Sequence, residues 1–158
     1  MRLLLLASLL LVTACGADKA PAAPSTTVTV LGEWRGEWQP QTCVEANAAG
    51  GCSALAGGTI RMLFSGSLTE HEGTVTLGAL VIPVSGTATT TGAATLAGSK
   101  TENGVATTIA DGQAVVSGTT ITGSYTYTSA AADSVVTATV TFFGVKVGSS
   151  GGPSRTLP

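Results

Sequence analysis

Charged and aromatic side chains are scarce in this chain of 158 residues: charged residues make up 10% of it and aromatic residues 4%. Its 7 lysines and arginines are outnumbered by 9 aspartates and glutamates, so a basic surface that could hold a nucleic acid backbone is not expected. One histidine and 3 cysteines are too few for a self-contained zinc site of the His/Cys type. We therefore expect neither a nucleic acid partner nor a bound metal.

Catalytic motifs are equally scarce. His71 is the single histidine, and no Gly-x-Ser-x-Gly sequence accompanies it to suggest a hydrolase. The stretch Glu70–Gly73 has the composition of a tight hairpin, which predicts that His71 lies at a solvated tip. Glu33 and Glu37 flank Arg35 with the spacing of one strand face, which is typical of surface charge rather than of an acid–base pair. The sequence predicts a non-enzyme with no catalytic residue, and it offers no phosphate loop or dinucleotide fingerprint for a cofactor.

Long apolar runs are missing except at the beginning of the chain. Met1 and Arg2 precede an apolar run from Leu3 to Val12. At ~1.5 Å per residue, that run spans about half of a ~30 Å hydrocarbon core. A run of this length after a positive start is typical of a secretory signal. We expect residues 1–14 to be a signal peptide that is removed on export.

The run ends in Val12-Thr13-Ala14-Cys15, which resembles the signal of bacterial lipoproteins. In that family a branched apolar residue and two small residues precede a cysteine that becomes the acylated start of the mature protein. The resemblance implies that Cys15 carries palmitate-type acyl chains and anchors the protein to a membrane of the cell envelope. Gly16, in place of the aspartate that retains enteric lipoproteins at the inner membrane, favours the outer membrane. The alternative is ordinary cleavage near Ala14 that leaves Cys15 a free thiol.

The segments around the folded body differ from it in composition. Residues 15–27 contain prolines and alanines without apolar periodicity, which predicts a flexible tether after the anchor. Residues 148–158 predict a disordered tail. Cys43 and Cys52 lie in a loop expected over residues 40–57. An exported protein meets an oxidising compartment, so we expect a disulfide between them; the alternative, a redox pair, usually has two intervening residues.

The body, residues 28–147, alternates apolar and polar side chains with a period of two, which predicts strands. Trp34 and Trp38 share the inward face of the first strand, and Leu68 is placed inward near the end of the second. The 21 glycines and 26 threonines suit turns and the outer faces of strands. Eight strands are expected, at residues 28–38, 58–69, 74–81, 83–90, 94–101, 104–110, 113–128 and 134–147.

Short turns link the expected strands. Asn103-Gly104 and Asp111-Gly112 have the composition of two-residue hairpins. Pro83 fits only the start of a strand or a bulge, and Gly118 is expected to kink the seventh strand. Eight antiparallel strands joined by tight turns favour an all-β, closed up-and-down meander barrel, because closure removes free edges. A β-sandwich is the alternative.

The first strand adds a second resemblance. Gly32-Glu33-Trp34 is similar to the Gly-x-Trp motif of lipocalins and other calycins, and the longer stretch 32–38 resembles the opening of small bacterial lipoproteins of unassigned function. The lipocalin resemblance implies that Trp34 closes one end of the barrel beneath a basic residue from late in the chain, for which Lys146 is the candidate. The late arginine motif and the C-terminal helix of lipocalins are absent.

Four aromatic residues are candidates for the closed end or wall of a pocket: Trp34, Trp38, Tyr125 and Tyr127. The alternatives are that the tryptophans are ordinary core and that the tyrosines form a cross-strand ladder. The first hypothesis for function is a barrel that binds or sequesters a small apolar molecule. The second is a filled barrel that contacts another envelope component, as yet unknown, through its outer surface or its disulfide loop. An enclosed apolar cavity of at least ~300 Å³ favours the first, and close packing favours the second.

Overall fold

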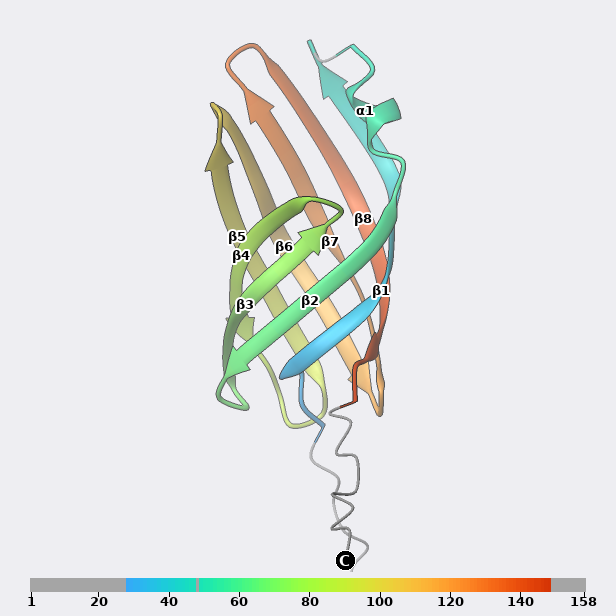
Figure 1. The fold of residues 1–158 in the computed structure, drawn as a ribbon, viewed down its shortest axis with the longest axis vertical. Helices are drawn as coiled ribbons and strands as arrows, with labels where there is room; N and C mark the ends of the chain where they lie inside the picture. Colours follow the sequence, from blue (N-terminus) through green and yellow to red (C-terminus); the bar gives the residue numbers. More distant parts are fainter. Residues whose placement is uncertain (1–27, 48, 149–158) are drawn as a thin grey trace, which may run out of the picture.

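The computed structural model describes residues 28–47 and 49–148 as a single eight-stranded barrel (Figure 1). The expected signal peptide and tether, and the tail beyond Gly148, lie outside the described residues. The strands are β1 (Gly32–Ala46), β2 (Gly58–Gly66), β3 (Glu70–Leu77), β4 (Leu80–Thr87), β5 (Ala93–Glu102), β6 (Val105–Ser117), β7 (Thr120–Ala131) and β8 (Ser134–Lys146).

Each strand pairs in antiparallel fashion with the next, and β1 pairs with β8 to close the ring. This order confirms the predicted all-β up-and-down barrel and excludes the sandwich. The described residues also contain one short helical turn, α1 (Gly51–Ala54). Among these residues no helix has the length and apolarity needed to cross a membrane.

The ring of paired strands is complete in the lower half of the barrel, whereas in the upper half some neighbouring strands are no longer paired. The part of β1 from Trp34 to Trp38 is paired with both β2 and β8, whereas its second half is paired with β8 alone. The β4–β5 ladder is the shortest, with Val84 opposite Gly98 and Ser85 opposite Ala97. In Figure 1, β5 to β8 and the end of β1 therefore rise above the shorter β2, β3 and β4.

The interior of the barrel is filled by side chains from all around the ring. Nine of them are essentially inaccessible to solvent and come from seven of the strands: Trp34, Ile60, Met62, Val75, Ile82, Ile109, Ile121, Tyr125 and Val140. The remaining strand, β5, contributes Ala94 and Leu96. An eight-stranded barrel is just wide enough to be filled in this way.

Two expected boundaries are wrong near the disulfide. The first strand does not end at residue 38 but continues to Ala46, because a bulge at Gln41, between Pro40 and Thr42, lets it follow β8. The loop expected over residues 40–57 is therefore shorter and begins after Ala46.

The hairpin expected at Asp111-Gly112 is also wrong. These two residues lie opposite Tyr125 as a β-bulge within β6, between the Ala110 and Gln113 pairs. Asp111 has a φ of 52°, the left-handed backbone that the Asp-Gly pair tolerates in a bulge as well as in a turn. The strand reverses six residues later, so Gly118, expected to kink a strand, instead forms the turn between β6 and β7.

The turn between β2 and β3 lies earlier than expected. The Ser67 hydroxyl accepts hydrogen bonds from the backbone N–H groups of Thr69 and Glu70 at 3.3 and 2.9 Å, which closes the turn before Glu70. Leu68, expected to face inward, lies on this turn and is 47% exposed. The Glu70–Gly73 stretch is consequently part of strand β3 and not a hairpin tip.

Pro83 lies in the middle of β4, not at a strand start or bulge. A Cβ on Gly98 would overlap the Pro83 carbonyl, which places that carbonyl on the β5 side. In an antiparallel sheet the N–H and C=O of one residue face the same neighbouring strand. The nitrogen of Pro83, which has no hydrogen to donate, therefore faces β5 as well. Pro83 is tolerated there because the β4–β5 ladder is short.

Candidate functional site

Trp34 occupies the lower part of the barrel and is completely buried. Its indole N–H donates a hydrogen bond of 2.7 Å to the Val30 carbonyl, so burial leaves no polar atom of the ring unpaired. The Lys146 ammonium lies 5.2 Å from the centre of the ring, within the range of a cation–π contact. A basic residue from late in the chain over this tryptophan is the arrangement that the calycin resemblance implies.

Trp38 lies higher on the same face of β1, where it is 8% exposed. It is opposite Phe142 of β8 on one side and Gly58 of β2 on the other. It lines a shallow groove of about 300 Å³ together with residues 56–59. Trp38 therefore contributes both to the core and to the edge of a surface groove.

Tyr125 and Tyr127 point into the barrel from β7, as neighbours on one strand face. The Tyr125 ring packs against Phe142 with 5.8 Å between the centres of the rings. Its hydroxyl is buried and has no hydrogen-bond partner within the described part of the chain. Burial, with a smaller contribution from Tyr127, raises the pKa of the Tyr125 hydroxyl well above its usual range, so this group stays protonated.

His71 does not lie at a solvated hairpin tip, as the sequence suggested. It is 4% exposed and points inward from β3, where it packs edge-on against Phe64 with 5.1 Å between ring centres. Gly66 and Gly86 lie beside it on the two neighbouring strands, which leaves room for the imidazole. Burial lowers the pKa of His71, an effect that the Thr95 backbone partly opposes, and neither ring nitrogen has a hydrogen-bond partner in residues 28–47 and 49–148.

The disulfide between Cys43 and Cys52 is confirmed, with 5.7 Å between the two Cα atoms. It ties the upper end of β1 to α1. The Glu45 carboxylate accepts hydrogen bonds from the backbone N–H groups of Cys52, at 2.8 Å, and Gly50, at 3.4 Å. The bridge and the Glu45 bonds together hold this loop against the upper part of the barrel.

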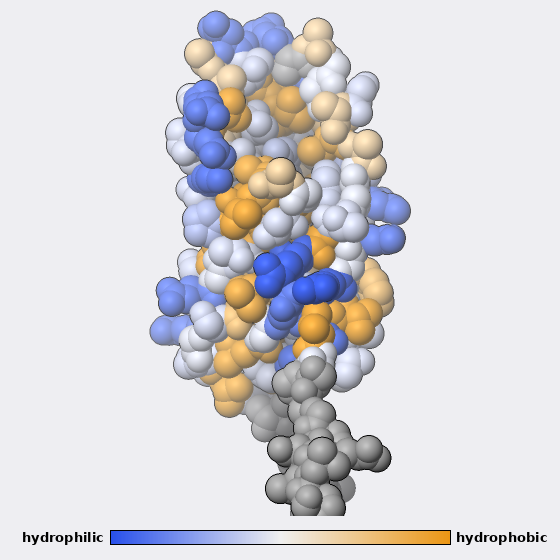
Figure 2. All heavy atoms as spheres, viewed as in Figure 1, coloured by the Kyte–Doolittle hydropathy of each residue, from blue (hydrophilic) through white to orange (hydrophobic). Residues whose placement is uncertain are grey.

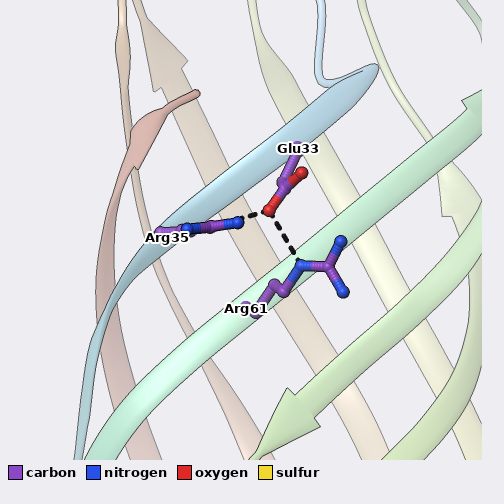
Figure 3. A network of polar contacts seen from close by, with 3 residues as sticks. All are labelled: Glu33, Arg35 and Arg61. Carbon is purple, nitrogen blue, oxygen red and sulfur yellow. Dashed lines mark hydrogen bonds and ion pairs between the residues drawn. The ribbon is translucent and has the colours of Figure 1, made fainter. Parts of the chain in front are cut away.

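A charged cluster on the outer wall joins two strands (Figure 3). One carboxylate oxygen of Glu33 accepts hydrogen bonds from the Nε–H groups of both Arg35, at 2.7 Å, and Arg61, at 2.8 Å. The Arg61 bond, and then the Arg35 bond, lower the pKa of Glu33 to about 2. The alternation of the sequence predicts that Glu33, Arg35 and Arg61 all face outward, but it does not predict the contact between Arg61 and Glu33, because the register that brings β2 beside β1 is not visible in the sequence.

Five hollows on the described residues open to solvent. The largest of the five, of about 560 Å³, lies at the β2–β3–β4 end, where His71 lines it together with residues such as Ser67 and Thr87. Four smaller grooves of about 260 to 410 Å³ have Trp38, Pro83, Arg61 or Phe143 among their lining residues. Of the nine most deeply buried side chains, Ile60 lines one of these five hollows, whereas Trp34, Met62 and Tyr125 line none of them.

Within the described residues no three His, Cys, Asp or Glu side chains come together in a group that could hold a metal ion. Glu70 and Glu72 are exposed on the face of β3 opposite to the inward-pointing His71, although all three residues line the hollow of about 560 Å³. Comparison with family models, with curated proteins and with solved structures found no match.

Proposed function

We propose that the protein is a lipid-anchored protein of the bacterial envelope whose barrel is filled and which acts through its outer surface. The observation that carries this proposal is the packing of the interior, where side chains such as Trp34, Met62 and Tyr125 leave the barrel axis without solvent access. A filled barrel offers its walls and loops, rather than a chamber, to other molecules. The membrane anchor is inferred from the lipoprotein-like sequence ending at Cys15.

The anchor is tested by the mass of the mature protein. We expect the chain purified from its membrane to begin at Cys15 and to carry a diacylglyceryl group, with or without a further acyl chain. We expect Cys15→Ser, as the matched variant, to leave the membrane fraction. An unmodified Cys15 in a protein that is released without detergent would show that the anchor is wrong.

The filled barrel is tested by native mass spectrometry on the same protein under oxidising conditions, with a mixture of lipids and other apolar molecules offered. Apart from its acyl chains, we expect a bare mass that is two hydrogens lighter than the reduced chain, because Cys43 and Cys52 are joined. A reproducible additional mass that organic solvent releases would contradict the proposal.

Binding of a small apolar molecule is the second candidate, and one observation favours it. The Tyr125 hydroxyl is buried without a partner among the described residues, and an acceptor group on a bound molecule could satisfy it. The same mass measurement distinguishes the two candidates. If a ligand is found, Tyr125→Phe should weaken its retention while Tyr127→Phe serves as the matched control.

A further inference from the structure

We propose that the β4–β5 seam, the interrupted ladder between these two strands, is an acid-sensitive gate in the wall of the barrel, and that His71 operates it. At neutral pH the imidazole is uncharged and lies in the wall. In mild acid it gains a proton, leaves the wall and lets the seam open. The gate goes beyond the proposed function, since it depends neither on the anchor nor on what the outer surface contacts.

His71 belongs to β3 but reaches the boundary between β4 and β5. Its neighbours across the two ladders of β3 are Gly66 of β2 and Gly86 of β4, neither of which has a side chain. A Cβ on Gly86 would lie 3.0 Å from Nε2 of His71 and would overlap the Thr95 carbonyl of β5. The imidazole therefore lies against the backbone of β4 next to the point where β4 meets β5.

The ladder between β4 and β5 is interrupted beside the imidazole. Its paired positions are few: Val84 with Gly98, Ser85 with Ala97, and the single bridge from Ala88 to Ala94. Between them, the Thr87 N–H donates a hydrogen bond of 3.0 Å to the side-chain hydroxyl of Thr95. Few bonds must therefore break for β4 to move away from β5, which makes this seam a place where the barrel can open locally.

No charged side chain in the wall can compensate a proton on His71. Strand β4 has no titratable side chain. On β2, Arg61 faces outward and is paired with Glu33. On β5, Lys100 and Glu102 are paired with each other near the end of the strand.

The surroundings of the buried imidazole favour its neutral form. Both ring nitrogens lack a hydrogen-bond partner within the described part of the chain, and Phe64 packs edge-on against the ring. Burial lowers the pKa of His71, and the Thr95 backbone opposes this effect only in part. The closed wall therefore binds the proton more weakly than a solvated histidine does.

The hollow of about 560 Å³ gives the protonated imidazole a place to go. His71 lines this hollow together with Glu70 and Glu72, which are exposed on the other face of β3. Figure 2 shows hydrophilic side chains at the lower left edge of the molecule, near the turn from β2 to β3 in Figure 1. His71 is the second residue of β3, so only the beginning of the strand has to leave its ladders. Two carboxylates then favour the imidazolium in the hollow.

The direction of the switch follows from these two positions of the ring. In the hollow the imidazole binds a proton with at least the ordinary affinity of histidine, whose pKa is about 6.5, and in the wall it binds a proton more weakly. The closed wall is therefore favoured above that pH, and the share of open molecules rises as the pH falls below it. From about pH 7.5 to about pH 5.5 the ratio of open to closed molecules should increase about tenfold.

The test is hydrogen exchange with mass spectrometry on the mature protein with its disulfide intact. The rates are corrected for the intrinsic effect of pH on amide exchange. We expect the protection of residues 84–88 and 93–98 to fall about tenfold over this pH range. The faster exchange should be insensitive to dilute urea, because a local opening exposes little surface. Since His71 is the single histidine of the chain, its NMR signal reports the protonation directly.

Opening also uncovers part of the apolar interior. Val84 of β4 and Leu96 of β5 are buried in the closed barrel, with 5% and 3% of their surfaces exposed. The dye ANS, which fluoresces on exposed apolar surface, should therefore gain fluorescence with the wild-type protein in mild acid. His71→Phe should show no such gain.

The variants separate the proton on His71 from acidity in general. His71→Phe keeps an aromatic ring in the wall but binds no proton, so exchange in the seam should become independent of pH. Glu70→Gln with Glu72→Gln removes both carboxylates from the hollow and should reduce the increase in acid without affecting exchange at neutral pH. Glu37→Gln with Asp133→Asn, which removes two exposed carboxylates from other parts of the barrel, is the matched control and should leave the increase intact.

Three results would overturn the proposal. An increase in exchange that persists in His71→Phe would assign the effect to another group. An increase in the seam with the same urea dependence as exchange in β7 would show that His71 acts only on unfolding of the whole barrel. An increase that is unchanged by Glu70→Gln with Glu72→Gln would show that the imidazolium does not move into the hollow. None of these results bears on the anchor or on the filled barrel, which the mass measurements test.

Discussion

The position of His71 differs from the one predicted from the sequence, and this difference changes how the histidine affects the stability of the fold. A solvated histidine would titrate without affecting the fold, whereas this one is buried with no hydrogen-bond partner among the described residues. Around it lie Phe64, Gly66, Gly86 and the backbone of Thr95, none of which carries a side-chain charge. A proton on the imidazole would therefore be poorly compensated in the native state.

This environment predicts a loss of stability in mild acid. The native pKa of His71 is lowered, so below about pH 6.5 the unfolded chain binds a proton that the native barrel does not. The free energy of unfolding should therefore be constant above that pH and decrease as the pH falls below it. Urea unfolding at several pH values measures the slope.

His71→Phe is the variant that removes this titration. It should flatten the decrease below pH 6.5 without affecting the decrease near and below pH 4.5, where Glu33, whose pKa is lowered to about 2, loses its ion pairs. If the wild-type protein and His71→Phe have the same pH profile, His71 is not the group responsible.

At the scale of the element, the backbone of β8 passes so close to Gly36 of β1 that it leaves no room for a side chain. A Cβ on this residue would overlap the backbone of Phe143 and Gly144. We expect Gly36→Ala to reduce the free energy of unfolding by about 3 kcal/mol or more, because backbone cannot move aside as a flexible side chain can. Gly148→Ala, where a Cβ meets no other atom, is the matched control and should change little.

The disulfide loop gives a second prediction at this scale. Replacing Cys43 and Cys52 together by serine should lower the free energy of unfolding by about 2–3 kcal/mol in the loop-closure account. The barrel should remain, since the bridge joins β1 only to the short segment around α1. Amide exchange should then increase in residues 49–57 and stay unchanged in β6 and β7. Exchange that increased throughout the barrel would show that the bridge supports the whole fold.

Alternation and composition predicted the elements better than their ends. The inward faces of Trp34, Met62 and Phe142 follow from a period of two, and Asn103-Gly104 forms the expected turn with both residues at positive φ. Asp111-Gly112 carries the same local signal, but the pairing of β6 with β7 continues past it as a bulge. Local sequence cannot distinguish these outcomes, because an Asp-Gly or Asn-Gly pair accommodates positive φ both at the two residues of a turn and at the one residue, Asp111, that has it in this bulge.

The candidate site was predicted less well for a related reason. The burial of Trp34 at one end of the barrel could be expected from the Gly-x-Trp motif. The hydrogen bond from Arg61 to Glu33 could not be expected, because it joins residues that are 28 positions apart in the sequence. That contact depends on the register between β1 and β2, which follows from the packing of the whole ring. His71 was misplaced because the Ser67 hydroxyl closes the turn three residues before the expected tip.

At the scale of the whole molecule, the ring has one weak seam. The β4–β5 ladder has two paired positions in its strands and the single bridge from Ala88 to Ala94, and Pro83 supplies no N–H to it. We expect amide exchange to be fastest along this seam and slowest in β7, whose ladders to β6 and β8 are long. Hydrogen exchange with mass spectrometry of short peptides measures this order. Slow exchange of β4 and β5, relative to β7, would show that the short ladder does not set the weakest point.

The contact that closes the ring has a consequence for the order of synthesis. Twelve positions of β1 pair with β8, so the first strand to leave the ribosome has its longest partner in the last. Until that last strand is made, β1 has only its shorter pairing with β2, and the barrel cannot close. The barrel of a nascent chain therefore stays open until β8 has been synthesised. A chain that cannot close its barrel early suits the export on which the proposed anchor depends, because a secretion channel accepts only unfolded polypeptide.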